Sequence, residues 1–280
     1  MLKITITTIL GSTSRNSSTA RRFARPAIAA LCLTQLVGPA DAGGFAFTGV
    51  SPSGGSVANA NPAEAEDASV LWFNPAGMTN LSGTQAVLGA GYLIFQGDFD
   101  NDPTRSISSG GAPATGGDGG DFGVDSPVPS FYAALELDTP MPAYLGIGVN
   151  APFALATNYD YGWIGRYDAL ESTLTNFNIN PAVSVALTDF ISIGAGVNVQ
   201  YSTVTLSQAI DTGAFVGAPA ADDSMVTMDA DGFAPGYNFG VMLYPSDRFR
   251  MGISYRSSIK MDYDGTADFD LSGSGEIVSG

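Results

Sequence analysis

The sequence predicts an all-β protein, a transmembrane antiparallel β-barrel with a small helical plug near its N-terminus. Three observations lead to this fold class. The chain of 280 residues is rich in Gly, with 35, and poor in charged residues, at 14%, and this composition favours strands over helices. Most segments after residue 84 alternate apolar with small or polar residues. The N-terminal segment has the composition of a secretory signal.

The composition also excludes several classes of function. The chain has no His and a single Cys, Cys32, so imidazole-dependent nucleophile systems, disulfides and thiolate metal sites are absent. We therefore expect no enzyme, no cofactor and no metal site. The net charge is −16, and so acidic a surface repels nucleic acid instead of binding it.

Residues 1–42 have the three parts of a signal peptide. The basic stretch Arg21–Arg25 precedes the apolar run Ala27–Gly38, and Ala40–Ala42 has the small residues of a cleavage site. The apolar run is shorter than the roughly 20 residues that a membrane-spanning helix needs. The prediction is therefore export, with cleavage after Ala42.

Residues 43–83 are predicted to form the plug, or hatch. The stretch Asp67–Leu81 lacks any alternation and carries one of the two Trp residues. Asn-Pro pairs at 61–62 and 74–75 can each place Asn at an N-cap and Pro at the first helical position. We expect two short helices, about Pro62–Ala68 and from Pro75 onward, that bury Leu71, Trp72 and Phe73.

Residues 84–280 are predicted to form the barrel wall. In the segment 174–187, for example, Phe177 and Ile179 alternate with Asn178 and Asn180. A soluble β-sandwich also alternates. The membrane barrel is favoured because the strands approach the 9–11 residues of a spanning strand and because their second face is polar but uncharged. About eight strands are expected, at 84–95, 128–138, 143–150, 174–187, 190–206, 233–244, 248–260 and 262–274.

The predicted connections differ in length. Leu187–Ile191 and Tyr244–Phe249 are short, whereas 97–129, 151–172 and 207–232 are long. In outer-membrane barrels short turns face the periplasm and long loops face outward. The acidic connection 97–129 is either a calcium-binding loop or a solvated flexible one. Since the chain ends without a terminal aromatic residue, we expect a barrel that is incomplete at its C-terminus.

An ordered set of motifs resembles the FadL/TodX family of outer membrane transporters for long-chain fatty acids and toluene. The set begins with Gly43–Phe47, continues through Ala65–Ser69 and Phe73–Met78, and extends downstream over nearly all of residues 43–280. Later parts of it are Ala151–Leu155, Gly165–Tyr167, Asn178–Ser184, Ile193–Gly196 and Met251–Lys260.

The resemblance implies a monomeric barrel of about fourteen strands in the outer membrane of a Gram-negative bacterium, in contact with lipid and lipopolysaccharide. It implies transport of long-chain fatty acids or other hydrophobic small molecules, with capture at extracellular loops, transfer to a pocket in the lumen and hatch-gated lateral release. The predicted gating residues are Gly43, Phe45, Phe47, Asn74, Pro75 and Ala76. The predicted ligand-binding residues are Trp72, Phe73, Trp163, Ile164, Arg166 and Tyr167.

Plainer interpretations of these residues stay open. The gating residues also fit a helix cap and packing inside the barrel, and the loop residues around Trp163 also fit packing within their own loop. Arg166 suits a ligand carboxylate or a carboxylate of its own loop. Arg250 and Arg256 are interpreted as partners of carboxylates in the lumen. For the whole protein, the alternatives are a general porin, which a bulky plug disfavours, or an outer membrane adhesin.

Overall fold

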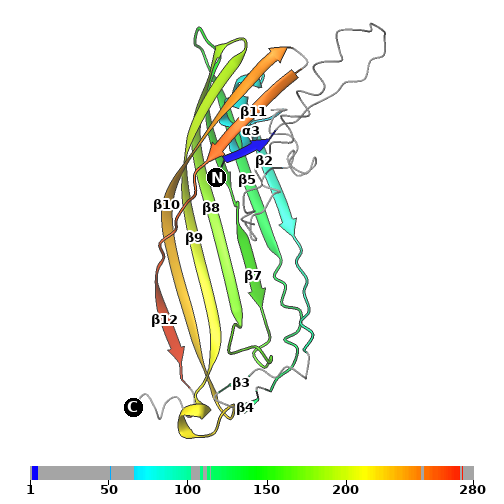
Figure 1. Ribbon diagram of the computed structural model, residues 1–280, viewed down its shortest axis with the longest axis vertical. Helices are drawn as coiled ribbons and strands as arrows, with labels where there is room; N and C mark the ends of the chain where they lie inside the picture. Colours follow the sequence, from blue (N-terminus) through cyan, green and yellow to red (C-terminus); the bar gives the residue numbers. More distant parts are fainter. Residues whose placement is uncertain are drawn as a thin grey trace, which may run out of the picture. The chain divides into compact units, whose positions relative to one another are not determined.

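The computed structural model describes residues 2–5, 51, 66–101, 108–109, 112–113, 115–246, 249–271 and 273 (Figure 1). The chain divides into two units, and these residues all belong to the unit that excludes residues 8–44. Apart from strand β1 (Leu2–Thr5), the predicted signal peptide lies outside the described residues, as do Gly43, Phe45 and Phe47. Within the described part of the chain, no helix is long and apolar enough to cross a membrane.

One large antiparallel sheet dominates the structure (Figure 1). Each long strand pairs with the next one in the chain, and β1 pairs with the far side of the last. A separate small ladder joins β3 (Ser108–Ser109) and β4 (Ala112–Pro113). The predicted all-β antiparallel fold is therefore confirmed. The long strands are β2 (Gln85–Leu93), β5 (Ser126–Leu137), β6 (Ala143–Asn150), β8 (Glu171–Thr188), β9 (Ile191–Asp211), β10 (Asp223–Ser246) and β11 (Phe249–Arg256).

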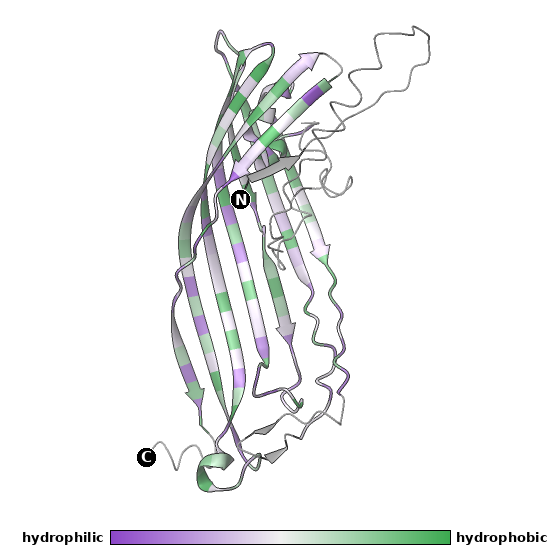
Figure 2. Cartoon of the chain, in the orientation of Figure 1, coloured by the Kyte–Doolittle hydropathy of each residue, from purple (hydrophilic) through white to green (hydrophobic). Residues whose placement is uncertain are grey.

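Hydrophobic and hydrophilic residues alternate along the long strands (Figure 2), and successive side chains of a strand point to opposite faces of the sheet. On β8 the apolar Ile179 and Val183 point outward, and Val183 is 54% exposed. Asn178 and Asn180 of the same strand point inward and are fully buried. A soluble sandwich would bury the apolar face instead. An apolar outer face around a polar interior is the arrangement of a barrel wall in a membrane.

Strands β9 and β10 are longer than predicted. They stay paired from Ile191 opposite Leu243 to Asp211 opposite Asp223. The predicted long connection 207–232 is therefore wrong, and only residues 212–222, with the 3-10 helix η2 (Gly213–Val216), join the two strands. In this part the outward positions of β9 are polar (Thr203, Thr205, Ser207), so the apolar alternation ends before the strand does.

The last two predicted strands are in fact one interrupted strand. β11 pairs with the 238–246 part of β10, and β12 (Asp264–Asp270) pairs with its 225–231 part. The expectation of two neighbouring strands was wrong because residues 257–263 continue along β10 instead of reversing. The seven residues 257–263 lie opposite only six residues of β10, 232–237. Because of this one extra residue, even-numbered side chains point inward on β11 but outward on β12.

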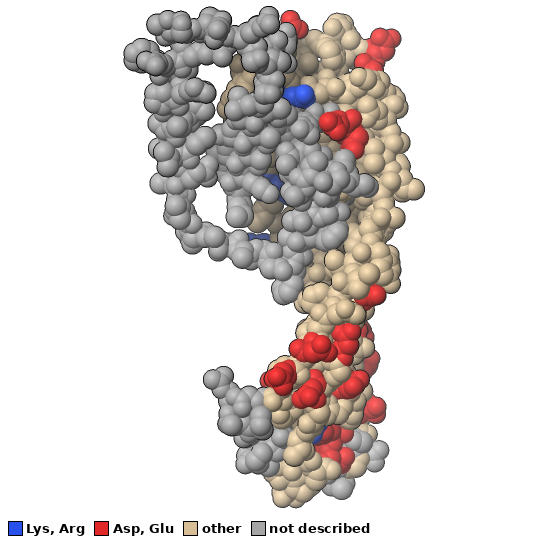
Figure 3. All heavy atoms as spheres, turned by 90° about the vertical axis from the view of Figure 1, so that its right-hand side faces the viewer, with Lys and Arg blue, Asp and Glu red and all other residues tan. Residues whose placement is uncertain are grey.

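The shift brings acidic side chains together on the outward face. Asp264 of β12 lies opposite Asp231 of β10, and Asp268 lies opposite Thr227 near Asp229. Figure 3 shows many Asp and Glu side chains in this lower part of the view, toward the end with the long connections, and few basic ones. Carboxylates of this density require water, so this end of the sheet lies beyond the apolar part of a membrane.

The wall is interrupted a second time, between β5 and β7. Strand β7 (Ala154–Asn158) lies inside the segment 151–172, which was predicted to be a long connection. β7 pairs with β8. Among the described strands, the Ser126–Ser130 part of β5 pairs only with β2, because β6 ends at Asn150. The interruption extends up to an isolated bridge between Gly123 and Thr157.

Two prolines face this interruption. The Glu136 N–H donates to Thr84 at the start of β2, at 3.3 Å. Since N–H groups along an antiparallel strand point alternately to its two neighbours, odd-numbered residues of β5 point theirs toward β6 and β7. Pro127 and Pro129 therefore remove two donors from the interrupted edge, as prolines commonly do at unpaired strand edges.

Candidate functional site

The plug segment, Glu66–Leu81, lies against the inner face of the sheet. It contains α3 (Val70–Phe73) and the 3-10 helix η1 (Pro75–Asn80). Asn74 between them is extended, and its Oδ1 accepts a hydrogen bond from Ala76 N at 3.1 Å. This is the predicted Asn-Pro cap. The first predicted helix is not helical at residues 66–68, and the rest of it lies outside the described residues.

Glycines in the wall form the seat of the plug segment. A methyl group on Gly194 of β9 would lie 2.5 Å from Ala76 N, and one on Gly240 of β10 would collide with Asn74 Oδ1. Asn74 Nδ2 also donates to Val241 O of β10, at 3.2 Å. The backbone of the plug thus approaches the wall more closely than any side chain allows, and Asn74 both caps the helix and binds the wall.

An apolar core joins α3 to the other side of the wall. Leu71 and Met78 are fully buried against Tyr132 of β5 and Tyr144 of β6. The Tyr144 hydroxyl donates to Leu81 O at 2.7 Å. The predicted burial of Leu71 is confirmed, whereas Trp72 and Phe73 are only half-buried, and Trp72 packs against the edge of this core.

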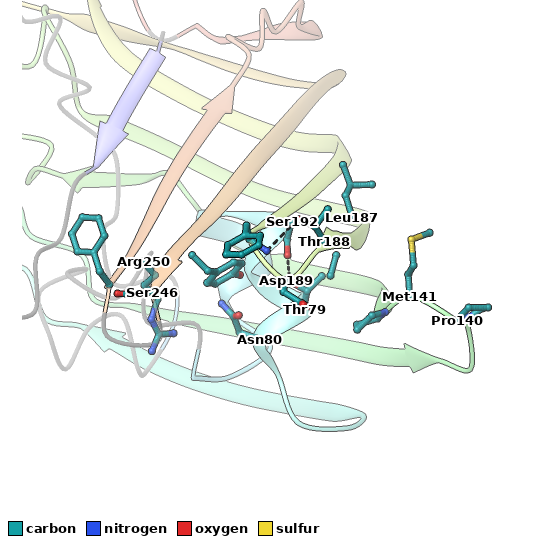
Figure 4. Close-up of a pocket in the computed structure, with 15 residues that line it drawn as sticks. Thr79, Asn80, Pro140, Met141, Leu187, Thr188, Asp189, Ser192, Ser246 and Arg250 are labelled. Carbon is teal, nitrogen blue, oxygen red and sulfur yellow. Dashed lines mark hydrogen bonds between the residues drawn. The ribbon is translucent and has the colours of Figure 1, made fainter.

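A cavity of about 820 Å³ opens between the plug segment and the short turns (Figure 4). Thr79 and Asn80 line it from η1, and Thr188 and Arg250 line it from the strand ends. The Thr79 hydroxyl donates to Ser192 Oγ at 2.9 Å. Apolar side chains, among them Met141, Leu187 and Phe190, line the same cavity, so its wall is mixed in polarity.

Trp72 binds the wall through an arginine. The Arg256 guanidinium carbon of β11 lies 3.6 Å from the centroid of the Trp72 ring, within the range of a cation–π interaction. Arg256 also donates to Trp72 O and to Asn198 Oδ1 of β9. The expected carboxylate partner of Arg256 is wrong, because its described partners are a backbone carbonyl, an amide oxygen and an aromatic ring.

Asparagines continue this contact along the inner face. Asn198 and Asn180 both donate to Asn238 Oδ1, at 3.0 Å. Asn180 also donates to Val197 O at 2.8 Å, and this replaces the backbone N–H that Pro181 lacks opposite Val197. The Nδ2 group of Asn238 and both amide atoms of Asn178 are buried without a hydrogen-bond partner.

The predicted loop residues form a separate cluster, the loop cluster, around Trp163. Its indole ring stacks on Tyr159 at 3.9 Å between centroids, Tyr159 stacks on Phe122 at 4.8 Å, and Phe99 meets Trp163 edge-on. Trp163 and Ile164 are buried, at 7% and 6% exposure. These side chains therefore pack within the loops.

Arg166 closes the loop cluster with an ion pair. Its Nε lies 2.7 Å from Asp223 Oδ2 at the start of β10, and its other nitrogens reach Thr115 O, Trp163 O and the Tyr167 hydroxyl. The partner is Asp223 and none of the carboxylates of its own loop. Burial lowers the pKa of Arg166, but Asp223 raises it overall. Burial, and then the bond that it donates to Asp223, raise the pKa of Tyr167 to about 12.

The acidic connection after β2 is ordered by backbone contacts. Asp121 Oδ1 accepts hydrogen bonds from Gly97 N and Gly123 N, both at 3.0 Å, and these bonds lower the pKa of Asp121. Within the described ranges, no group of three or more acidic, Cys or His residues is arranged to hold a metal ion.

The structure thus divides the predicted site residues into two groups. Asn74, Pro75 and Ala76 lie with Trp72 and Phe73 in the plug segment, and the residues near Trp163 lie in the loop cluster. Sequence reasoning missed the seat glycines and the role of Arg256. The strand period could have placed Arg256 on the inner face, because Gly252, Ser254 and Arg256 are spaced two residues apart and lie on one face of β11.

The chain is similar in sequence to known outer membrane proteins. The model of the family "Outer membrane protein transport protein (OMPP1/FadL/TodX)" matches residues 33–278. Outer membrane protein P1 of Haemophilus influenzae is 28% identical over 257 residues, 81% of this chain and 56% of that protein. A long-chain fatty acid transport protein of Salmonella typhi is 24% identical, over 81% and 53%. The chain therefore spans about half the length of the curated relatives that it matches.

Solved structures share the fold. A FadL homologue of Pseudomonas aeruginosa superposes with a TM-score of 0.62 at 23% identity, over 69% of this chain and 48% of that one. The CymD monoaromatic hydrocarbon channel superposes with a TM-score of 0.54 at 17% identity, over 82% and 59%. The match of the family model over most of the sequence shows that the chain belongs to the OMPP1/FadL/TodX family of outer membrane transport proteins.

Proposed function

We propose that the protein transports hydrophobic small molecules, long-chain fatty acids in particular, across the outer membrane. The observation that carries the proposal is the plug segment on the inner face of a sheet whose outer face is apolar. A plug seated on glycines and held by Asn74 blocks water-filled diffusion. An apolar solute then needs a route that avoids the aqueous lumen. In this proposal the protein acts as a monomer, and its outer face contacts lipid and lipopolysaccharide.

The interruption between β5 and β7 supports lateral release in this proposal. In the described residues no strand covers the Ser126–Ser130 edge of β5 on this side. Pro127 and Pro129 remove N–H groups that would otherwise pair or remain unsatisfied there. A gap of this kind lets an apolar ligand leave sideways into the bilayer instead of crossing an aqueous exit.

The loop cluster is the proposed capture end. Trp163, Ile164, Arg166 and Tyr167 belong to the connections that we expect to face outward. Since the first three are buried, capture in this proposal requires the loops to part or to bind ligand on the outer side of the aromatic stack. The proposed gating role of Gly43, Phe45 and Phe47 depends on a shift of the mature N-terminus when ligand binds.

Uptake measurements test the proposal directly. Cells that lack their own transporter and produce this protein should accumulate labelled oleate, and toluene if the selectivity is broad. If neither uptake rises above the vector control, the transport proposal is wrong. Liposome swelling separates a general porin, because rapid flux of small sugars through the reconstituted protein would mean an open lumen.

A further inference from the structure

Two apolar hollows meet on the outer face of the wall. Both lie over β6, β8, β9 and β10, and their volumes are about 460 and 470 Å³. Val183, Ala195 and Phe239 line both of them. Val183 and Phe239 are 54% and 50% exposed, so they point away from the buried inner face. The two hollows therefore form one groove on the outer face, here called the wall groove.

The wall groove is deep at Ala195 because the neighbouring side chains are larger. Ala195 of β9 lies opposite Val183 of β8 and Phe239 of β10. Ile193 and Val197 are its neighbours along the same face of β9, and all four surrounding side chains are exposed. The methyl group of Ala195 is thus a floor between higher walls. A hollow left empty here would lose the dispersion contacts of its lining atoms.

The floor of the groove offers few groups that bind water. Pro181 has no N–H, and the Val197 carbonyl across from it accepts a hydrogen bond from Asn180 Nδ2 at 2.8 Å. Polar residues along the groove, such as Ser184 and Asn238, turn their side chains to the inner face, where they are buried. An ordered water needs about two to four polar partners. An apolar occupant therefore suits the wall groove better than water does.

The position of the groove along the strands indicates which lipids it meets. The chain belongs to a family of outer membrane proteins, so membrane lipid covers the apolar outer face of its wall. On β9 the apolar outward positions run from Ile193 to Tyr201, and polar Thr203 follows. The groove occupies the part of this zone nearest the short turn between β8 and β9. Since short turns face the periplasm in outer-membrane barrels, the groove faces the inner leaflet, which consists of phospholipid.

We propose that the wall groove binds one acyl chain of an inner-leaflet phospholipid, and that this lipid exchanges more slowly than the other lipids around the wall. The chain lies over Ala195 and contacts the groove on its floor and on both sides. A lipid on the convex remainder of the outer face contacts protein on one side only, so it gains fewer dispersion contacts. The inference goes beyond the proposed transport and does not depend on which solute the protein carries.

Native mass spectrometry of the purified, folded protein tests the site. We expect one phospholipid per protein to remain bound at collision energies that remove the others. Ala195→Leu fills the floor and should lower the retained fraction about fivefold or more. Ala86→Leu is the matched control, because Ala86 is exposed on β2 and lies in the same cross-strand row as Ile147 and Pro181. Equal retention by the two variants would overturn the proposal.

Cross-linking on the unaltered protein tests the location without any variant. The protein is placed in vesicles of phosphatidylethanolamine and phosphatidylglycerol that contain a phospholipid with a diazirine in its acyl chain. Adducts should concentrate at residues 181–185 and 193–197 and be several times rarer on β2. An even distribution over the outer face contradicts a site, and so does retention of lipopolysaccharide or of a second copy of the chain in place of phospholipid. A failure to take up oleate would disprove the proposed transport and leave this inference intact.

Discussion

Two tryptophans in this protein each lie beside an arginine, and the two sites differ in one group. At Trp163 in the loop cluster, Arg166 donates to the Trp carbonyl and pairs with Asp223. At Trp72 in the plug segment, Arg256 also donates to the Trp carbonyl, but its other partners are an amide and the indole ring. The carboxylate makes the first site a permanent clamp. At the second site the described partners of the arginine carry no compensating charge.

The packing around the two sites agrees with this difference. The loop cluster stacks three aromatic rings and buries Trp163 almost completely. In the plug segment Leu71 and Met78 are fully buried, yet Trp72 remains half-exposed. The plug is thus fully buried at Leu71 and Met78 and only half-buried at Trp72. The four experiments that follow test this contrast, in order of decreasing expected effect.

Removal of the plug should have the largest effect. Deletion of Gly43–Leu81 is expected to leave a folded barrel with a conductance in planar bilayers as high as that of an open porin, because the seat glycines leave no other side chains to fill the space. Heat-modifiable migration on gels checks folding. Unchanged conductance would mean that this segment does not block the lumen.

Loss of the carboxylate at the loop cluster should be the next largest effect. Asp223→Asn leaves Arg166 buried without an anion, which costs about 3 kcal/mol, so the loops should become sensitive to external protease while the conductance stays low. Asp231→Asn, at an exposed position of the same strand, is the control. If the two variants resist protease equally, the ion pair does not clamp the loops.

Substitutions at the unpaired Ser126–Ser130 edge of β5 should have a smaller effect. The double variant Pro127→Val and Pro129→Val restores two N–H donors, so that β5 can pair further toward β7. We expect oleate uptake to fall severalfold, since each added hydrogen bond contributes about 1 kcal/mol to closing the gap. Binding of oleate should be unaffected. Uptake at the original rate would argue against release between these strands.

Acidification should produce the smallest effect, and only at the loops. The folded-state pKa of Asp121 lies below its usual value, so its contribution to loop stability is complete above about pH 4 and is lost as the pH falls through the lowered pKa. Trp163 fluorescence, measured from pH 5 downward, should report this loss, and Asp121→Asn should remove the transition. A midpoint above pH 4 would contradict the assignment to Asp121.

Much of the fold follows from the sequence because a membrane wall needs a strict alternation. β6 at Ala143–Asn150 matches its predicted range, β8 contains its own, and β9 begins within one residue of its predicted start. The prediction was weakest where the alternation carries no information. Beyond the apolar zone β9 and β10 continue with polar outer faces, and the one-residue insertion near residue 260 is invisible without the partner strand.

The candidate site was predictable only in part, for the same reason. Asn74 and Pro75 encode their own cap, since the hydrogen bond to Ala76 N is local. The partners of Arg166 and Arg256 are 57 and 184 residues away, at Asp223 and Trp72. No local pattern indicates pairings over such distances, because they depend on which strands become neighbours.

The plug segment shows both what the sequence determines locally and what only the tertiary structure decides. By itself the sequence determined that Asp67–Leu81 is a capped, apolar segment with no strand period, and that the strands after it have a polar face to enclose it. Only the tertiary structure decided that Gly194 and Gly240 form its seat and that Arg256 contacts Trp72 instead of the expected carboxylate. The physical reason is that caps and alternation arise from neighbours in the chain, whereas close approach and charge compensation arise from groups that folding brings together.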